Sequence, residues 1–207
     1  MALSAPQGDR LCRYAELIEK WNKGMNLVSR QDMGRLDARH LLDSLAAVPW
    51  LTGDSLLDIG TGPGLPGIPL AIARPDMTVT LWERMTRRVR FLQLVCRELG
   101  LTNVNARVCD FERETSLHKT HAFTNIVARA VAPIEQLWPI MRDHLSSNGR
   151  LIVYSRVISE TESGDETSRT RELCEVDGIA VEQLTYLVPG LQQSHRLQRL
   201  SVDSSIR

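Results

Sequence analysis

The sequence lacks the features of a membrane, secreted or metal-binding protein. No apolar run approaches the roughly 20 residues needed to cross a bilayer. The Met1–Gly8 segment has no basic stretch followed by an apolar core, so no signal peptide is expected. The cysteines form no C-x-x-C pair, which argues against a zinc site or a disulfide framework and predicts a cytoplasmic protein without a metal. They are Cys12, Cys96, Cys109 and Cys174.

An excess of charge of one sign is also missing. The chain has 25 basic and 25 acidic residues, so its net charge is zero and the molecule as a whole is not expected to attract nucleic acid. Any RNA binding must therefore come from a local basic patch. Of the basic residues 22 are arginine, which grips phosphate and stacks on bases, although we favour the codon bias of a GC-rich genome as the cause.

The 207 residues suit a single domain, 1–207, with a helical cap at 1–53 and an α/β core at 54–207. Periodicity predicts helices at 11–22, 37–48, 68–73, 86–99 and 133–145, and strands at 56–59, 78–82, 104–108, 125–128 and 151–154. This alternation is typical of a mostly parallel sheet with both faces covered. We expect residues 159–170 to form a loop, and weaker strands at 180–188 and 196–202 to pair antiparallel at one edge of the sheet.

A glycine-rich loop follows the first strand of the core. Gly60, Gly62 and Gly64 come directly after Asp58 in the pattern D-x-G-x-G-x-G. Glycines allow positive φ and close approach of a ligand to the backbone, and ligands of open α/β sheets bind at such strand ends. The loop also fits G-x-G-x-x-G, the dinucleotide fingerprint, but the glycine two positions after Asp58 favours S-adenosylmethionine.

Two carboxylates stand at the ends of the next strands. Glu83 follows the second strand and is placed to accept hydrogen bonds from ribose hydroxyls, which both kinds of cofactor carry. Asp110 follows the third strand, where it would border the adenine and accept from its amino group. A solvated carboxylate is an equally good interpretation of Asp110.

At this point the sequence resembles the family of ribosomal RNA small subunit methyltransferase G, also called glucose-inhibited division protein B. The residues that carry the resemblance are Trp21–Lys23, Asn26–Ser29, Arg39–Ser44, Asp58–Pro69, Arg87–Leu92 and Ala128–Ala130. The resemblance implies a Rossmann-like, seven-stranded S-adenosylmethionine methyltransferase fold with an antiparallel last strand. It also implies transfer of a methyl group to N7 of a guanine in small-subunit 16S ribosomal RNA, in the loop near the decoding site.

The resemblance further assigns cofactor contacts to particular positions. The predicted cofactor-binding residues, from the loop and the resemblance together, are Asp58, Gly60, Gly62, Gly64, Leu65, Glu83, Val108, Cys109, Asp110 and Arg129. Arg129, at the tip of the fourth strand, is the one candidate for a role at the reacting atoms. It is placed to grip the cofactor carboxylate, a phosphate or the guanine edge.

The reaction at N7 needs no base, because that nitrogen carries no proton, and catalysis would rest on proximity and alignment in a desolvated site. The sequence is consistent with a reaction of this kind, because it lacks two motifs that other methylation mechanisms use. It has no N-P-P-Y motif after the fourth strand and no Pro-Cys pair for covalent catalysis.

Several basic side chains are candidates for contact with RNA. They are Arg84, Arg87, Arg88 and Arg90 at the start of one helix, Arg30, Arg35 and Arg39 just before the apolar face of the helix at 37–48, and Arg156 after the fifth strand. Such clusters are more often solvated helix faces. His40, a further candidate for contact with RNA, lies three positions before Asp43. It is either part of a polar pair facing the active site or a hydrogen-bonding lock between cap and core, and we favour the lock.

Two other functions remain open. The first is an oxidoreductase using a nicotinamide or flavin cofactor. The second is a ribosome-binding module without catalysis, since Ser155-Arg156 stands where the family commonly has Lys-Gly. Intact glycines and Glu83 argue against the module. The expected partner is small-subunit ribosomal RNA or the 30S particle, and the expected state is a monomer.

Overall fold

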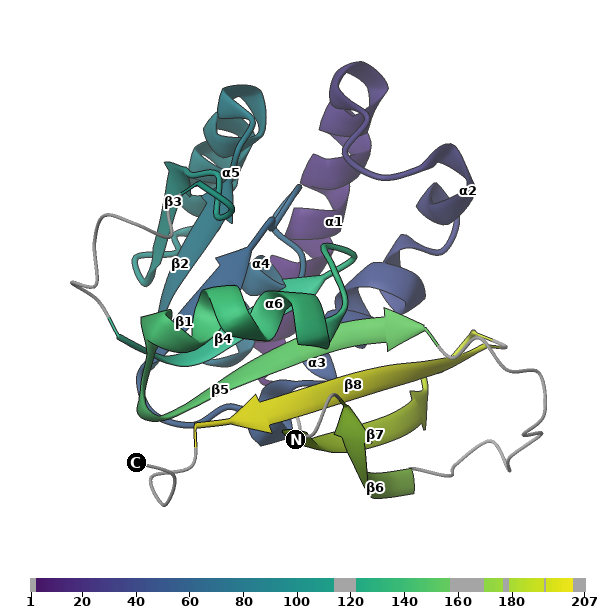
Figure 1. Cartoon of the computed structure of the whole chain (residues 1–207). Coiled ribbons are helices and arrows are strands. Elements are labelled where there is room, and N and C mark those ends of the chain that lie inside the picture. Colours follow the sequence, from purple (N-terminus) through teal and green to yellow (C-terminus); the bar gives the residue numbers. More distant parts are fainter. Residues whose placement is uncertain (1–2, 114–121, 157–169, 177–178, 192, 203–207) are drawn as a thin grey trace.

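A single mixed sheet organises the described part of the chain. The computed structural model describes residues 3–113, 122–156, 170–176, 179–191 and 193–202 (Figure 1). The strands are β1 (Ser55–Ile59), β2 (Thr78–Glu83), β3 (Val104–Val108), β4 (Phe123–Arg129), β5 (Leu145–Arg156), β6 (Thr170–Val176), β7 (Ile179–Leu187) and β8 (Ser194–Ser201). Their order across the sheet is β3-β2-β1-β4-β5-β8-β7-β6. The first five are mutually parallel, so their carboxyl ends share one edge, and the last three are antiparallel.

Helices cover the sheet on both faces. The helices that follow β1 are α4 (Gly67–Ala73), α5 (Thr86–Leu99) and α6 (Ile134–Met141). Successive side chains of β1 point to opposite faces of the sheet. Leu56 packs in the core beneath α4 and α5, whereas Leu57 and Ile59 pack in the core beneath α6. The sheet is therefore the middle layer of an α/β sandwich, as Figure 1 shows.

The segment before β1 forms the cap. Its elements are α1 (Ala5–Met25), α2 (Arg30–Met33), a π-helical turn at Asp37–Leu42, α3 (Asp43–Leu45) and a 3₁₀ turn at Val48–Trp50. The helix predicted at 37–48 is therefore present from Asp37 to Leu45, first with π-helical and then with α-helical hydrogen bonding, and it ends before the predicted Val48. The phenol of Tyr14, in the middle of α1, donates to the Pro63 carbonyl at 3.0 Å, which joins the cap to the glycine loop.

The predicted fold is confirmed, with one additional strand. The helix at 86–99 and the strand at 104–108 end where predicted, and the weak strands of the tail are β7 and β8. The described residues contain eight strands rather than seven, because β6 pairs with β7 at the far edge of the sheet. Leu173 in β6 is 81% exposed, so this edge strand lacks the buried apolar face that would mark it in the sequence. No helix among the described residues is long and apolar enough to cross a membrane.

Candidate functional site

The glycine loop turns sharply at the carboxyl end of β1. Gly60, Gly62 and Gly64 have φ of +62°, +59° and +110°, a region that side chains rarely adopt. Gly64 is also enclosed, since an added Cβ would lie 2.6 Å from Ile68 Cγ1 and 2.9 Å from Tyr14 Oη. A Cβ at Gly62 would meet nothing nearer than 4.0 Å. Gly64 therefore serves packing, whereas Gly62 leaves open space for a ligand.

Asp58 lies beneath the loop and is fully buried. Its Oδ2 accepts hydrogen bonds from the Thr61 hydroxyl at 2.5 Å and from the Gly67 amide at 2.7 Å. Burial raises the pKa of this carboxyl to about 7, and the two hydrogen bonds offset only part of that rise. Asp58 therefore holds the start of α4 against the loop.

Glu83, at the end of β2, faces the same loop and is 3% exposed. Its Oε2 accepts from the Gly62 amide at 3.1 Å and its Oε1 accepts from the Met85 amide at 2.8 Å. Arg88 lies 3.7 Å from Oε2. Each carboxylate oxygen retains a lone pair for a further donor, such as a ribose hydroxyl.

A cavity of about 330 Å³ opens beside Glu83. Its walls come from the ends of β1 to β4 and from α6, and they include Gly60, Glu83, Arg88, Cys109, Asp110 and Ala130. Val108 is 52% exposed at the tip of β3 and is not among the residues that line this cavity.

A larger cavity, of about 570 Å³, lies between the glycine loop and the cap. The residues that line it include Leu27, His40, Asp43, Gly62, Leu65, Arg129, Tyr154 and His195. Gly60 and Ala130 border both cavities, so the two adjoin at the tips of β1 and β4. Together they form a bent groove along the carboxyl edge of the sheet, where ligands of open α/β sheets bind.

A buried polar network closes the cap side of this groove. Asp43, 4% exposed, accepts from Arg129 at 3.3 Å, from the Tyr186 phenol at 2.6 Å, and pairs with His195 at 2.8 Å. Burial alone would raise the pKa of Asp43, but the hydrogen bonds from His195 and Tyr186 and the charge of Arg129 hold it below its usual range. Arg129 also lies 3.3 Å from Nδ1 of His40.

The network contains residues that sequence reasoning missed. The sequence patterns give no role to Tyr186 or His195, and they mark Asp43 only as the neighbour of His40. No local pattern marks the two C-terminal residues, because their partner lies 143 and 152 positions away. Arg129 of the core contacts the carbonyl and Nδ1 of His40. These contacts agree with the role favoured for His40, which is to fasten the cap to the core.

The predicted cofactor residues gather around the groove. Gly60, Gly62, Leu65 and Arg129 line the larger cavity, and Gly60, Glu83, Cys109 and Asp110 line the smaller one. Asp58 and Gly64 are absent from both sets and lie in the packing below. These placements leave their contact with a cofactor as a proposal.

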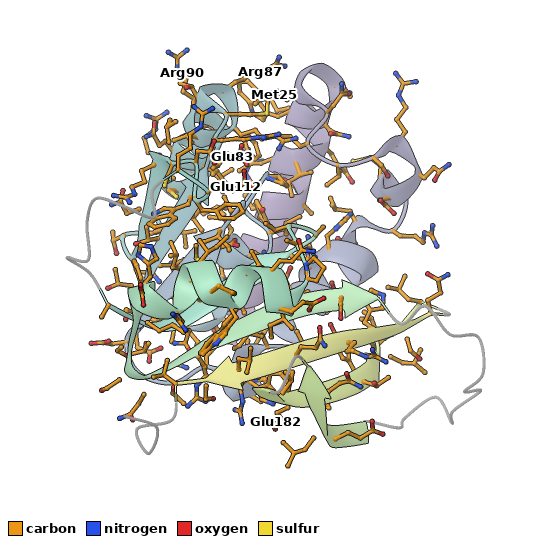
Figure 2. All side chains as sticks on the ribbon, viewed as in Figure 1. Met25, Glu83, Arg87, Arg90, Glu112 and Glu182 are labelled. Carbon is orange, nitrogen blue, oxygen red and sulfur yellow. The ribbon has the colours of Figure 1, made fainter. Side chains whose placement is uncertain are left out.

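The basic residues predicted to contact RNA lie in different environments. The guanidinium of Arg87 donates to the Gly24 carbonyl near the end of α1, and Figure 2 shows Arg87 and Arg90 at the outer end of α5 with Met25 close by. Arg84 and Arg88 line the smaller cavity. The side chains of Arg39 and Arg156 lie outside the described residues.

Comparisons with known proteins identify the family. The family model described as rRNA small subunit methyltransferase G matches residues 7–195. A protein named ribosomal RNA small subunit methyltransferase G from Laribacter hongkongensis is 35% identical over 202 residues, which are 98% of this chain and 92% of that one. Its namesake from Yersinia pestis is 43% identical over 137 residues, or 66% of this chain and 65% of that one.

Solved structures support the fold. A mutant of MtNAS in complex with S-adenosylmethionine superposes with a TM-score of 0.54 at 19% identity, covering 95% of this chain and 72% of that one. The complex of MtNAS with MTA and tNA gives a TM-score of 0.53 at 18% identity, covering 93% of this chain and 69% of that one. With the fold shared and the family model matched over residues 7–195, the chain belongs to the rRNA small subunit methyltransferase G family.

Proposed function

We propose that this protein methylates N7 of a guanine in small-subunit 16S ribosomal RNA, in the loop near the decoding site, with S-adenosylmethionine as methyl donor. The observation that carries the proposal is the bent groove, which joins a cavity at Glu83 to a cavity at Arg129 across the glycine loop. Membership of the family supports the reaction and the RNA. It also favours a methyltransferase over a nicotinamide or flavin oxidoreductase.

The residues of the groove fit the proposed cofactor. Glu83 would accept from the ribose hydroxyls, and Cys109 and Asp110 would border the adenine in the smaller cavity. The backbone at Gly60, which borders both cavities, and the open space at Gly62 would let the sulfonium centre extend into the larger cavity. There the guanidinium of Arg129, whose side chain is 14% exposed, would hold the carboxylate of the methionine part.

The chain's own contribution to the reaction is position. S-adenosylmethionine supplies an electrophilic methyl group on a sulfonium. Guanine N7 offers a lone pair without a proton, so the site needs no general base. Ala130, with φ of +56°, turns the backbone after Arg129 and borders both cavities, which supports a position for it beside the proposed point of transfer.

The target must be exposed before it can react. In A-form RNA the major groove, which contains N7, is too deep and narrow for a protein side chain to read. A guanine in an open loop, or one flipped out of a helix, can reach the groove. The substrate we propose is therefore ribosomal RNA in a state that presents an unstacked guanine.

The cap and the core are proposed to act as one domain, 1–207, with the cap at 1–53. Contacts from Asp43 to Arg129 and His195 support this organisation. The proposed partner is small-subunit ribosomal RNA or the 30S particle, and the proposed state is a cytoplasmic monomer.

The direct test uses radiolabelled S-adenosylmethionine and small-subunit particles from cells that lack the endogenous enzyme. We expect label on N7 of one guanine, mapped by chemical cleavage at methylated sites. Binding of the cofactor without transfer to any particle would contradict the proposed reaction and favour a ribosome-binding module without catalysis.

A further inference from the structure

A third cavity, of about 480 Å³, adjoins the groove at Ala130. Its lining combines the segment after β4, the end of β5, the start of α6 and β8, and includes Ala130, Pro133, Glu135, Ser155, Arg196 and Gln198. Its volume is within the range of small-molecule sites. None of its polar side chains has a role in the groove described above, apart from the border residues Tyr154 and Ser155.

The strands separate this cavity from the cofactor groove. Side chains alternate along β8, so His195 lines the larger cavity of the groove while Arg196 and Gln198 line the third cavity. Ala130 borders all three cavities. A ligand in the third cavity would therefore adjoin the groove at Ala130, whose side chain is a single methyl group, and at the other shared residues, which are Val131, Ala132, Tyr154 and Ser155.

The polar groups of the third cavity complement a guanine. Arg196 supplies donors, and its Nε is buried without a hydrogen-bond partner among the described residues. Glu135, in the first turn of α6, supplies acceptors. Guanine has an acceptor at O6 and donors at N1 and N2, which match this pair.

The remaining walls suit a flat base. Val131, Ala132, Pro133 and Val153 line the same cavity. Flipped bases are held by stacking on apolar side chains and read through their hydrogen-bonding edge. A backbone phosphate fits less well, because the carboxylate of Glu135 would repel it.

We propose that the third cavity receives the target guanine, with Arg196 donating to O6 and Glu135 accepting from N1 and N2. This leaves N7 directed toward Ala130 and the methyl donor. The inference rests on the proposed function and adds the residues that select the base. It assigns Glu135 and Arg196 as specificity-determining residues.

The test compares Glu135→Gln and Arg196→Gln with the wild-type protein on small-subunit particles, using labelled S-adenosylmethionine. We expect kcat/KM for methyl transfer to fall about tenfold to a hundredfold for each variant, the range for one base-reading hydrogen-bonded pair. The Kd for S-adenosylmethionine, measured by calorimetry, should stay within twofold of wild type, which also verifies folding. The matched controls are Asp143→Asn and Arg142→Gln, exposed residues at the other end of α6, and both should retain wild-type kcat/KM.

The outcomes separate the two proposals. If the wild type transfers no methyl group, the proposed function fails. If the wild type is active and both variants keep its kcat/KM, the third cavity does not read the guanine. Equal weakening of cofactor binding and transfer in the variants would assign the cavity to the cofactor and overturn the inference.

Discussion

Nδ1 of His195 lies 2.8 Å from Oδ1 of Asp43, although the two residues are 152 positions apart. The contact fastens β8, the last strand, to the cap that precedes the first. The other carboxylate oxygen of Asp43 accepts from Arg129 at the tip of β4. One buried carboxylate thereby sets the position of the cap over the groove at the carboxyl edge of the sheet and of the arginine within it.

Replacing Asp43 with asparagine should destabilise the protein by about 3 kcal/mol at pH 7, because Arg129 would lose its buried counter-charge. Urea denaturation measures the change. The pKa of Asp43 is lowered in the fold, so its stabilisation is complete above its ordinary value of 3.8 and is lost as the pH falls through the lower folded value. The difference in the free energy of unfolding between wild type and variant should therefore narrow toward pH 3. A difference that does not change with pH would contradict an ionised Asp43 paired with Arg129.

Alanine at Gly64 and at Gly62 should have different effects. Both positions have positive φ, which costs an alanine about 1–2 kcal/mol. Gly64→Ala adds clashes with Ile68 and Tyr14 and should lower the melting temperature much further. The Gly62→Ala variant should have a melting temperature only slightly below that of the wild type, but it should bind the cofactor more weakly. Equal melting temperatures for the two variants would contradict the packing role of Gly64.

The carboxyl of Asp58 should make stability depend on pH near neutrality. Burial raises its pKa from 3.8 to about 7, so the folded state holds a proton that the unfolded state releases between these values. Stability from this group falls as the pH rises through that window and is constant above it. The Asp58→Asn variant has no carboxyl that titrates at this position. The free energy of unfolding of the variant, relative to that of the wild type, should therefore rise by on the order of 4 kcal/mol between pH 4 and pH 8. Parallel stability curves would show that Asp58 does not titrate in this window.

Glu83→Gln should raise the Kd for S-adenosylmethionine at least about tenfold, the range for removing a hydrogen bond to a charged group. The amide keeps a single acceptor oxygen, which cannot serve the Gly62 and Met85 amides and two hydroxyls together. Calorimetry gives the Kd. Glu19→Gln, exposed on α1, is the control and should bind the cofactor as the wild type does. Similar affinities for the two variants would remove Glu83 from the cofactor site.

The start of α5 can be tested as an RNA-binding surface. Arg84 and Arg87 are exposed there, so the double variant Arg84→Gln, Arg87→Gln should bind the RNA less tightly. The slope of log Kd against log salt should flatten by about 0.7 to 0.9 for each phosphate that the variant no longer neutralises. Arg97→Gln, exposed in the last turn of α5, should leave the slope unchanged. An unchanged slope in the double variant would exclude this surface.

The sequence was sufficient to predict several elements that build the groove. The helix from Thr86 to Leu99 follows from its apolar period and from Gly100, which ends it in a left-handed conformation. Gly60 and Gly62 follow one buried strand, and Glu83 ends the next. Because neighbouring parallel strands bring their carboxyl ends to the same edge of the sheet, the sequence predicts that these residues lie close together. The helix depends on hydrogen bonding and periodicity within a few residues, and the meeting of the two strand ends depends on the parallel pairing of consecutive strands.

Tertiary structure alone decided the rest of the site. The helix predicted at 37–48 carries Asp43, which contacts Arg129, Tyr186 and His195 from distant parts of the chain. The strand β6 joins the sheet although its apolar residue Leu173 is exposed. A contact across 152 positions depends on the order in which β4, β5, β8 and β7 lie side by side. No periodicity records that order, because it is set by the packing of the whole sheet against the cap.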